Sequence, residues 1–208
     1  LFKNPALAGM YTRLLNEAEA VGDNREQQIE AARRTWYQGF IAEQIDAFCR
    51  DTEVLDTSGH RHKALLCGDD LAGFQAHYET PITYDYPANG HTYTVAKPGP
   101  WTQGPVMLQQ LALLKGFPIA EMDPSGADFV HTLMECAKLA FADREVYYGD
   151  PNFADVPLPT LLSDAYNDAR RKLVGETANY DFRPGEIDGF GQMPNLYPLG
   201  TTMRADKA

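Results

Sequence analysis

A single β-hairpin signal, in a chain whose other apolar patterns are helical, constrains the fold most. Between residues 81 and 97, apolar and polar residues alternate around Asn89-Gly90. That pair suits a two-residue hairpin turn because both positions tolerate positive φ. The register that this turn imposes places four side chains on one face: Tyr84, Tyr86, Tyr93 and Val95. The sequence therefore predicts an α+β fold that is mostly helical and contains one hairpin.

Helical spacing of apolar residues marks most of the remaining chain. Asn4-Pro5 suits a helix start, because Asn can cap free amides and Pro fits the first turn. The stripe predicted for this first helix comprises Leu7, Tyr11, Leu14, Leu15 and Ala18.

The longest predicted helix is capped by Ser125 and ends before Gly149, and a later helix is capped by Ser163. The stripe that we expect to face the core comprises Val130, Leu133, Ala137, Ala140, Phe141 and Tyr148. From residue 176 onward the periodicity is lost, and four Gly and three Pro lie among polar residues. We therefore expect residues 1–175 to form a helical segment with the hairpin at 81–97, and residues 176–208 to form a flexible tail.

The charge balance excludes two classes of partner. The chain has 18 basic and 29 acidic residues, a net charge of −11 and a pI near 4.8. These values argue against nucleic acid and against contact with an anionic membrane surface. The chain begins at Leu1 without Met or a signal sequence, so we expect a part of a longer protein, and the sequence leaves its localisation unknown.

Candidate metal ligands are sparse. The three cysteines form neither a disulfide framework nor a C-x-x-C pair. His60 and His62 could bind zinc together with Cys67 and Asp69, but the spacing matches no closed site, and a solvated connector is the preferred interpretation. We therefore expect no metal and no cofactor.

Local candidates for catalysis also have structural explanations. His131 and Glu135 lie one helical turn apart, as acid–base pairs and surface ion pairs both do. The Trp101–Gly104 loop could offer amides to an anion, although a tight turn needs the same residues.

Two further pairs complete the candidates. We interpret Asp143 and Arg144 as an internal ion pair, because Arg144 falls on the predicted apolar stripe. Thr201-Thr202 has no neighbouring base, so we do not assign it as a nucleophile.

Five segments in order resemble the gamma-glutamyltransferase (gamma-glutamyltranspeptidase) family, in the later part of its large subunit. They are NPALA (4–8), WYQGFIAEQI (36–45), DLAGF (70–74), ECAKLAFADR (135–144) and YGDPNFADVP (148–157). The family motif maps onto Asp143, Arg144, Gly149, Asp150 and Pro151. The loop at 98–105 departs from the PPPSSGG of many members.

The resemblance implies an N-terminal-nucleophile (Ntn) hydrolase with an αββα architecture, made as a self-cleaving precursor. In that family the first Thr of the small subunit attacks a gamma-glutamyl group, as in glutathione, and forms an acyl-enzyme. This chain would then be a scaffold fragment without a catalytic residue of its own, and the missing small subunit would be its partner.

Three interpretations stay open at this stage. The parent protein hydrolyses or transfers gamma-glutamyl groups, or it is a related acylase with a different acyl donor, or the chain is a non-enzymatic helical interaction module. We also expect the isolated chain to self-associate through the Tyr84, Tyr86, Tyr93 and Val95 face or through an outer strand edge.

Overall fold

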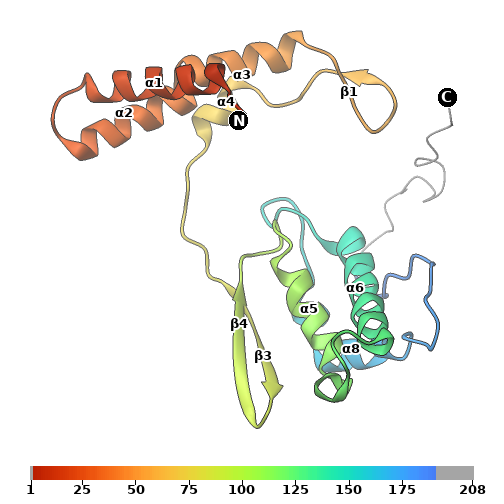
Figure 1. Cartoon of the computed structure of the whole chain (residues 1–208). Coiled ribbons are helices and arrows are strands. Elements are labelled where there is room, and N and C mark those ends of the chain that lie inside the picture. Colours follow the sequence, from red (N-terminus) through yellow and green to blue (C-terminus); the bar gives the residue numbers. More distant parts are fainter. Residues whose placement is uncertain (1, 191–208) are drawn as a thin grey trace. The chain divides into compact units, whose positions relative to one another are not determined.

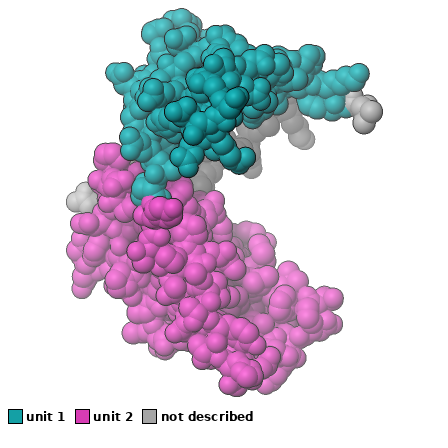
Figure 2. Space-filling view, turned by 90° about the vertical axis from the view of Figure 1, so that its left-hand side faces the viewer, with its two compact units in different colours: residues 1–77, 198–208 teal, residues 78–197 magenta. Residues whose placement is uncertain are grey.

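The computed structural model describes residues 2–190, which fall into two compact units, residues 2–77 and residues 78–190 (Figures 1 and 2). Helices dominate both units, and the strands of the described residues form two antiparallel pairs. Across residues 2–190, no helix combines the length and the apolar character that crossing a membrane requires. The mostly helical α+β class is thus confirmed.

The first unit is built from helices that pack on one another, followed by a very short strand pair. Its elements are α1 (Pro5–Glu19), α2 (Arg25–Gln38), α3 (Phe40–Asp51), β1 (Val54–Leu55), β2 (Arg61–His62) and α4 (Gly68–Gly73). Asn4 caps α1 as predicted, because its Oδ1 accepts a hydrogen bond from the Leu7 amide at 3.0 Å. At the junction of α2 and α3, a Cβ on Gly39 would lie 2.9 Å from the carbonyl oxygen of Thr35, so this close approach requires glycine.

The core of the first unit contains fewer residues of the predicted α1 stripe than that stripe comprises. Its buried cluster is Leu14, Phe40 and Ile41, and partly buried Met10, Ala32, Trp36 and Ile45 pack against it. Only Leu14 and Ala18 of the predicted α1 stripe are buried. Leu7, Tyr11 and Leu15 are each about half exposed, so three of the five residues of that stripe lie at the margin of the core.

The second unit contains the hairpin and three longer helices. Its elements are β3 (Ile82–Ala88), β4 (His91–Lys97), α5 (Gly104–Leu114), the 3-10 helix η1 (Ile119–Glu121), α6 (Ala127–Tyr147), α7 (Leu158–Leu161) and α8 (Asp164–Arg171). The predicted register is confirmed, since Tyr84 pairs with Val95 and Tyr86 pairs with Tyr93. Asn89 and Gly90 form the turn with φ of 52° and 74°, the positive values that this turn requires.

One face of the hairpin packs on α5. Tyr84 is buried with Leu108 and Ala112 of that helix, and the partly buried residues around them include Tyr86 and Val95. The face that we expected to drive self-association is therefore already covered within this unit, and of its four residues only Tyr93 is more than half exposed.

Helix α6 packs against α5 (Figure 1). Of the predicted stripe, Ala140 and Tyr148 contribute to this core, but the rest of the buried face is different. The buried cluster here is Val106, Leu113, Leu114, Cys136, Leu139 and Ala140. Val130, Leu133 and Phe141 of the predicted stripe are 51%, 37% and 37% exposed. The prediction was wrong for these three residues because α6 carries apolar residues on both faces, so spacing alone does not identify the buried face. Ser125 is not its cap either, since Gly126 occupies that position.

A pair of leucines on α6 tests this assignment. Leu139 is fully buried and Leu133 is 37% exposed, so Leu139→Ala should lower the free energy of unfolding by about 2–5 kcal/mol. Leu133→Ala should change it by less than about 1 kcal/mol. Urea unfolding followed by Trp101 fluorescence, in a Trp36→Phe background, measures the second unit. Equal losses for both variants would mean that both faces of α6 are covered in solution.

Candidate functional site

A buried carboxylate on α6, that of Asp143, joins four parts of the second unit. Its Oδ1 accepts hydrogen bonds from the Arg170 guanidinium on α8 at 3.1 Å and from the Gly185 amide at 2.7 Å. Its Oδ2 accepts a hydrogen bond from the side-chain amide (Nε2) of Gln109 on α5 at 2.6 Å. Burial raises the pKa of Asp143, although Arg170, the Gly185 amide and Gln109 oppose that change.

The internal ion pair thus exists, but its cation is Arg170 and not Arg144. The side chains of Asp143 and Arg170 are 0% and 6% exposed. Arg144 is one residue further along the helix, so its side chain points about 100° away. It lies 4.8 Å from the centre of the Phe141 ring and pairs with Glu145, which is exposed. Arg170 could have been found from the sequence, because it is a cation on the apolar face of a short amphipathic helix.

Glu135 is a second buried carboxylate on the same helix, and its side chain is 1% exposed. It accepts hydrogen bonds from the Arg183 guanidinium at 2.9 Å and from the Asn179 amide at 3.2 Å, and it also pairs with Lys138. Burial alone would raise the pKa of Glu135, but the hydrogen bonds from Lys138 and the Asn179 amide, together with Arg183, lower it below its ordinary value.

Residues 175–190, which we call the strap, lie along α6. The ring Nε2 of His131 is 2.7 Å from the carbonyl oxygen of Gly175, and Lys138 donates to the carbonyl of Asn179 at 2.6 Å. Tyr147, at the far end of the helix, donates to the carbonyl of Gly185 at 2.6 Å. The structure therefore gives the described part of the predicted tail specific partners. His131 and Glu135 thus each contact the strap.

The remaining motif residues form the turn that follows α6. Asp150 Oδ1 accepts a hydrogen bond from the Asn152 amide, and the Asp150 carbonyl accepts from the amides of Phe153 and Ala154, all at 2.9 Å. A Cβ on Gly149 would lie 3.2 Å from the Ala154 Cβ. The Gly149-Asp150-Pro151 segment therefore closes a compact turn.

The Trp101–Gly104 loop is a tight turn, as its composition favours. The Thr102 hydroxyl donates to the Gly99 carbonyl at 2.9 Å and accepts from the Gly104 amide at 3.0 Å. The Trp101 indole donates to Glu79 at 2.8 Å. The amides of Thr102 and Gly104 are therefore bonded within the loop and are not available to an anion. A shallow surface pocket lies between this loop and the end of α6.

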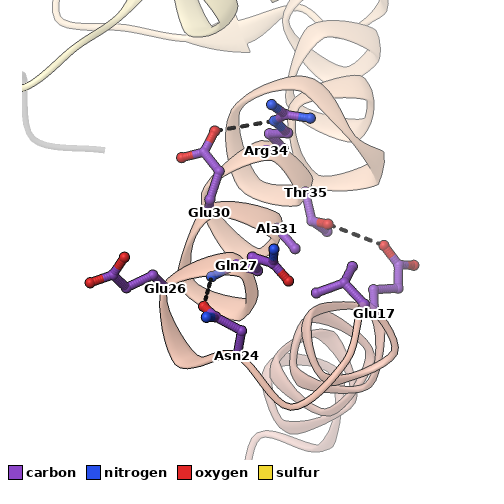
Figure 3. Close-up of a pocket in the computed structure, with 9 residues that line it drawn as sticks. Glu17, Asn24, Glu26, Gln27, Glu30, Ala31, Arg34 and Thr35 are labelled. Carbon is purple, nitrogen blue, oxygen red and sulfur yellow. Dashed lines mark hydrogen bonds and ion pairs between the residues drawn. The ribbon is translucent and has the colours of Figure 1, made fainter.

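Another pocket lies between α1 and α2 in the first unit (Figure 3). Its polar groups contact one another: Glu30 pairs with Arg34, the Thr35 hydroxyl lies 3.4 Å from Glu17, and Asn24 caps α2 through the Gln27 amide. These contacts occupy polar groups around the pocket, and they do not set up a nucleophile with a neighbouring base.

The structure does not assemble the candidate metal site. His62 Nδ1 lies 2.6 Å from Asp56 Oδ2, and the ring of His60 stands edge-on to that of His62 at 6.4 Å. In the described range 2–190, no three His, Cys, Asp or Glu side chains form a group that could hold a metal ion. Thr201 and Thr202 lie outside the described residues.

Substitutions should separate the buried pair from its exposed neighbour. Asp143→Asn or Arg170→Met leaves one buried partner without its counterion, which typically costs about 3–5 kcal/mol of unfolding free energy. Arg144→Met removes an ion pair with an exposed partner and should cost less than about 1 kcal/mol. Urea melts of the three variants measure these differences. A loss at Arg144 that equals the loss at Asp143 would contradict the assignment.

The two buried carboxylates should also give opposite pH dependences of stability. The lowered pKa of Glu135 means that its contribution is present above the ordinary glutamate pKa of about 4.3 and is lost as the pH falls through the folded-state pKa. The raised pKa of Asp143 means that its contribution favours folding at low pH and is lost as the pH rises through that pKa.

Glu135→Gln should therefore flatten the loss of stability on acidification, whereas Asp143→Asn should steepen it. Thermal melts between about pH 3 and 7 measure the slopes. Leu139→Ala serves as the control, because it lowers stability without removing a titrating group. The same change of slope in all three variants would show that neither carboxylate is responsible.

Comparison with known proteins identifies the family to which this sequence is similar. The sequence model of the gamma-glutamyltranspeptidase family matches residues 1–202. The chain is 37% identical over 110 residues to the Acylase ACY 1 proenzyme of Pseudomonas sp. (strain SE83), which covers 53% of this chain and 19% of that protein. It is 34% identical over 132 residues to the Glutathione hydrolase proenzyme of Escherichia coli (strain K12), which covers 63% of this chain and 20% of that protein.

A solved structure agrees with the sequence matches. The structure of LmbA2991HD superposes with a TM-score of 0.73 at 51% identity and covers 89% of this chain and 30% of that chain. In the sequence matches, the chain spans about a fifth of the length of the acylase and glutathione hydrolase proenzymes named above. Because the family match extends over almost all of its residues, the chain belongs to the gamma-glutamyltranspeptidase family.

Proposed function

We propose that this chain is the scaffold part of an enzyme that hydrolyses or transfers gamma-glutamyl groups, as in glutathione, through an acyl-enzyme. The family match over residues 1–202 carries this proposal. Relatives that are named as proenzymes of a hydrolase and of an acylase support the same general chemistry. The nucleophile would be the N-terminal Thr of a small subunit made from the same precursor.

The chemistry of the described residues supports a scaffold role. Asp143 and Glu135 accept hydrogen bonds from cations and amides inside the fold, so they hold helices and the strap in place. Within residues 2–190, the hydrogen bonds and ion pairs of these two carboxylates involve no Ser, Thr or Cys side chain. This chain would therefore supply the frame for the reaction, and the small subunit would supply the attacking group.

Free edges and faces of the second unit suit a larger assembly. The β3–β4 sheet has two strands, so each strand has one edge without a partner within the described residues. Helix α6 exposes Val130, Leu133 and Met134 on the side away from its core contacts. In the proposed enzyme, this edge and this face would join an αββα arrangement with the remaining parts of the protein.

An acylase with a different acyl donor is the second candidate. The 37% identity to an acylase proenzyme favours it, as does the 98–105 loop, which lacks the PPPSSGG of many family members. Both candidates share the acyl-enzyme, and they differ in the group that the nucleophile receives.

The proposal predicts that the 208-residue chain alone does not turn over substrate. Purified chain, incubated with glutathione and separately with a gamma-glutamyl p-nitroanilide, should release product no faster than buffer does. Turnover that disappears in a Thr201→Ala, Thr202→Ala double variant would contradict the scaffold role. The coding sequence downstream gives an independent check, because a small subunit should begin with a Thr-x-His segment and contain a Gly-Gly pair.

A further inference from the structure

One face of α6 carries a row of apolar side chains that stay exposed within residues 2–190. Val130 and Met134 are each about half exposed, Phe141 is 37% exposed, and Ala137 between them is partly buried. Because successive helix residues are turned by about 100°, these four side chains fall within about 60° of one another. We call Val130, Met134, Ala137 and Phe141 the α6 seam. Contiguous exposed apolar side chains of this kind mark a contact site.

The α6 seam is not used by the core of the second unit. Helix α5 packs on the hairpin through Leu108 and Ala112 and on α6 through Val106 and Leu113, which lie on roughly opposite sides of α5. The hairpin, α5 and α6 therefore follow one another in that order (Figure 1). Helix α6 meets α5 with the side that carries Leu139, so the seam faces away from α5. A helix that is apolar on both sides is typical of an inner layer of a larger domain.

The spacing within the α6 seam indicates which kind of element fits it. Its residues recur at intervals of four, three and four, which are the intervals between a and d positions of a heptad and suit contact with one other helix. The seam spans about 16 Å, or three helical turns. Partly exposed Lys138 and Glu145 lie along one border, so the apolar strip is narrow, whereas a sheet would cover a wider strip. The small Ala137 leaves a hole for a large side chain of the partner.

The lengths of related proteins indicate where this helix comes from. The chain covers 30% of the LmbA2991HD chain and about a fifth of the two proenzymes, so more than two thirds of a protein of that length lies outside this segment. A second copy of the chain fits less well, because each copy carries a net charge of −11 and the copies repel each other.

We propose that the α6 seam binds one amphipathic helix from the part of the same protein that lies outside residues 1–208. The inference rests on the proposed function, because it takes this chain as the scaffold part of a longer enzyme. The helix lies along α6 at the crossing angle of about 20° that heptad contacts favour, and one of its large apolar side chains fills the hole at Ala137. This contact removes Val130, Met134 and Phe141 from water.

Photo-crosslinking of the full-length protein identifies the element on the seam. Photo-reactive benzoylphenylalanine replaces Val130, Met134 or Phe141, one at a time, and mass spectrometry locates the crosslinked residue. All three positions should crosslink to one segment outside residues 1–208. Moving the probe from 130 to 141 should move the crosslinked residue by about 11 residues if the partner is a helix, but by only about five if it is a strand.

Two alanines of α6 give a matched pair of variants. Ala137→Trp fills the hole in the seam, so it should lower the melting temperature of the full-length protein and leave that of the isolated 208-residue chain nearly unchanged. Ala140→Trp overpacks a fully buried site and should lower both melting temperatures. Asp128 is the crosslinking control, because it is exposed and lies about 160° around the helix from Val130. A probe at Asp128 should not crosslink to the segment that the seam contacts.

The outcomes separate this inference from the proposed function. Crosslinks that advance by about five residues, crosslinks within residues 1–208 of a second copy, or no crosslinks at all would each overturn the helix on the seam. Equal effects of Ala137→Trp on the chain and on the full-length protein would do the same. Hydrolysis of glutathione and of other acyl donors by the unmodified full-length protein is measured separately. If that protein is inactive while the helical crosslinks are present, the proposed function fails and the helix contact stands.

Discussion

The second unit depends on a negative charge that has been removed from water. An ionised carboxylate in the interior is stable only when cations and hydrogen-bond donors replace its hydration shell. Asp143 obtains these from Arg170, Gln109 and the Gly185 amide, which belong to α8, α5 and the strap. None of these donors is adjacent to Asp143 in the sequence. The packing of α5, α6, α8 and the strap is therefore coupled, because each supplies or requires part of the same small cluster.

The features that the sequence predicted well are those with local causes. The hairpin register follows from Asn89-Gly90, since a two-residue turn fixes every pair of residues along the two strands. The caps at Asn4 and Ser163 also follow from a side chain that bonds an amide three residues later. The family was predicted from motifs in order, and the match over residues 1–202 confirms it.

Features that depend on residues far apart in the sequence could not be predicted from local patterns. Helix α6 is apolar on two sides, so the choice between Leu133 and Leu139 for the core depends on where α5 packs. The partner of Asp143 is 27 residues away on another helix, whereas Arg144 was chosen because it falls on the predicted apolar stripe of α6. The strap gave no periodic signal because, apart from Arg183, its contacts with α6 use the main-chain atoms of Gly175, Asn179 and Gly185, which leave no trace in residue type.

The use of main-chain atoms has a consequence for how this segment can change over evolution. Every residue except proline offers the same N–H and C=O, so residue 179 can be replaced by most side chains without losing its bonds to Glu135 and Lys138. Residue 185 is different, because the space beside Tyr166 and Arg170 admits only a hydrogen atom. Substitution in the strap should therefore be blocked at residue 185, restricted at Arg183 because its side chain pairs with buried Glu135, and much freer at residue 179. Related proteins should then differ in the residue types along the strap while they share Gly185 and the two acidic residues of α6, Glu135 and Asp143.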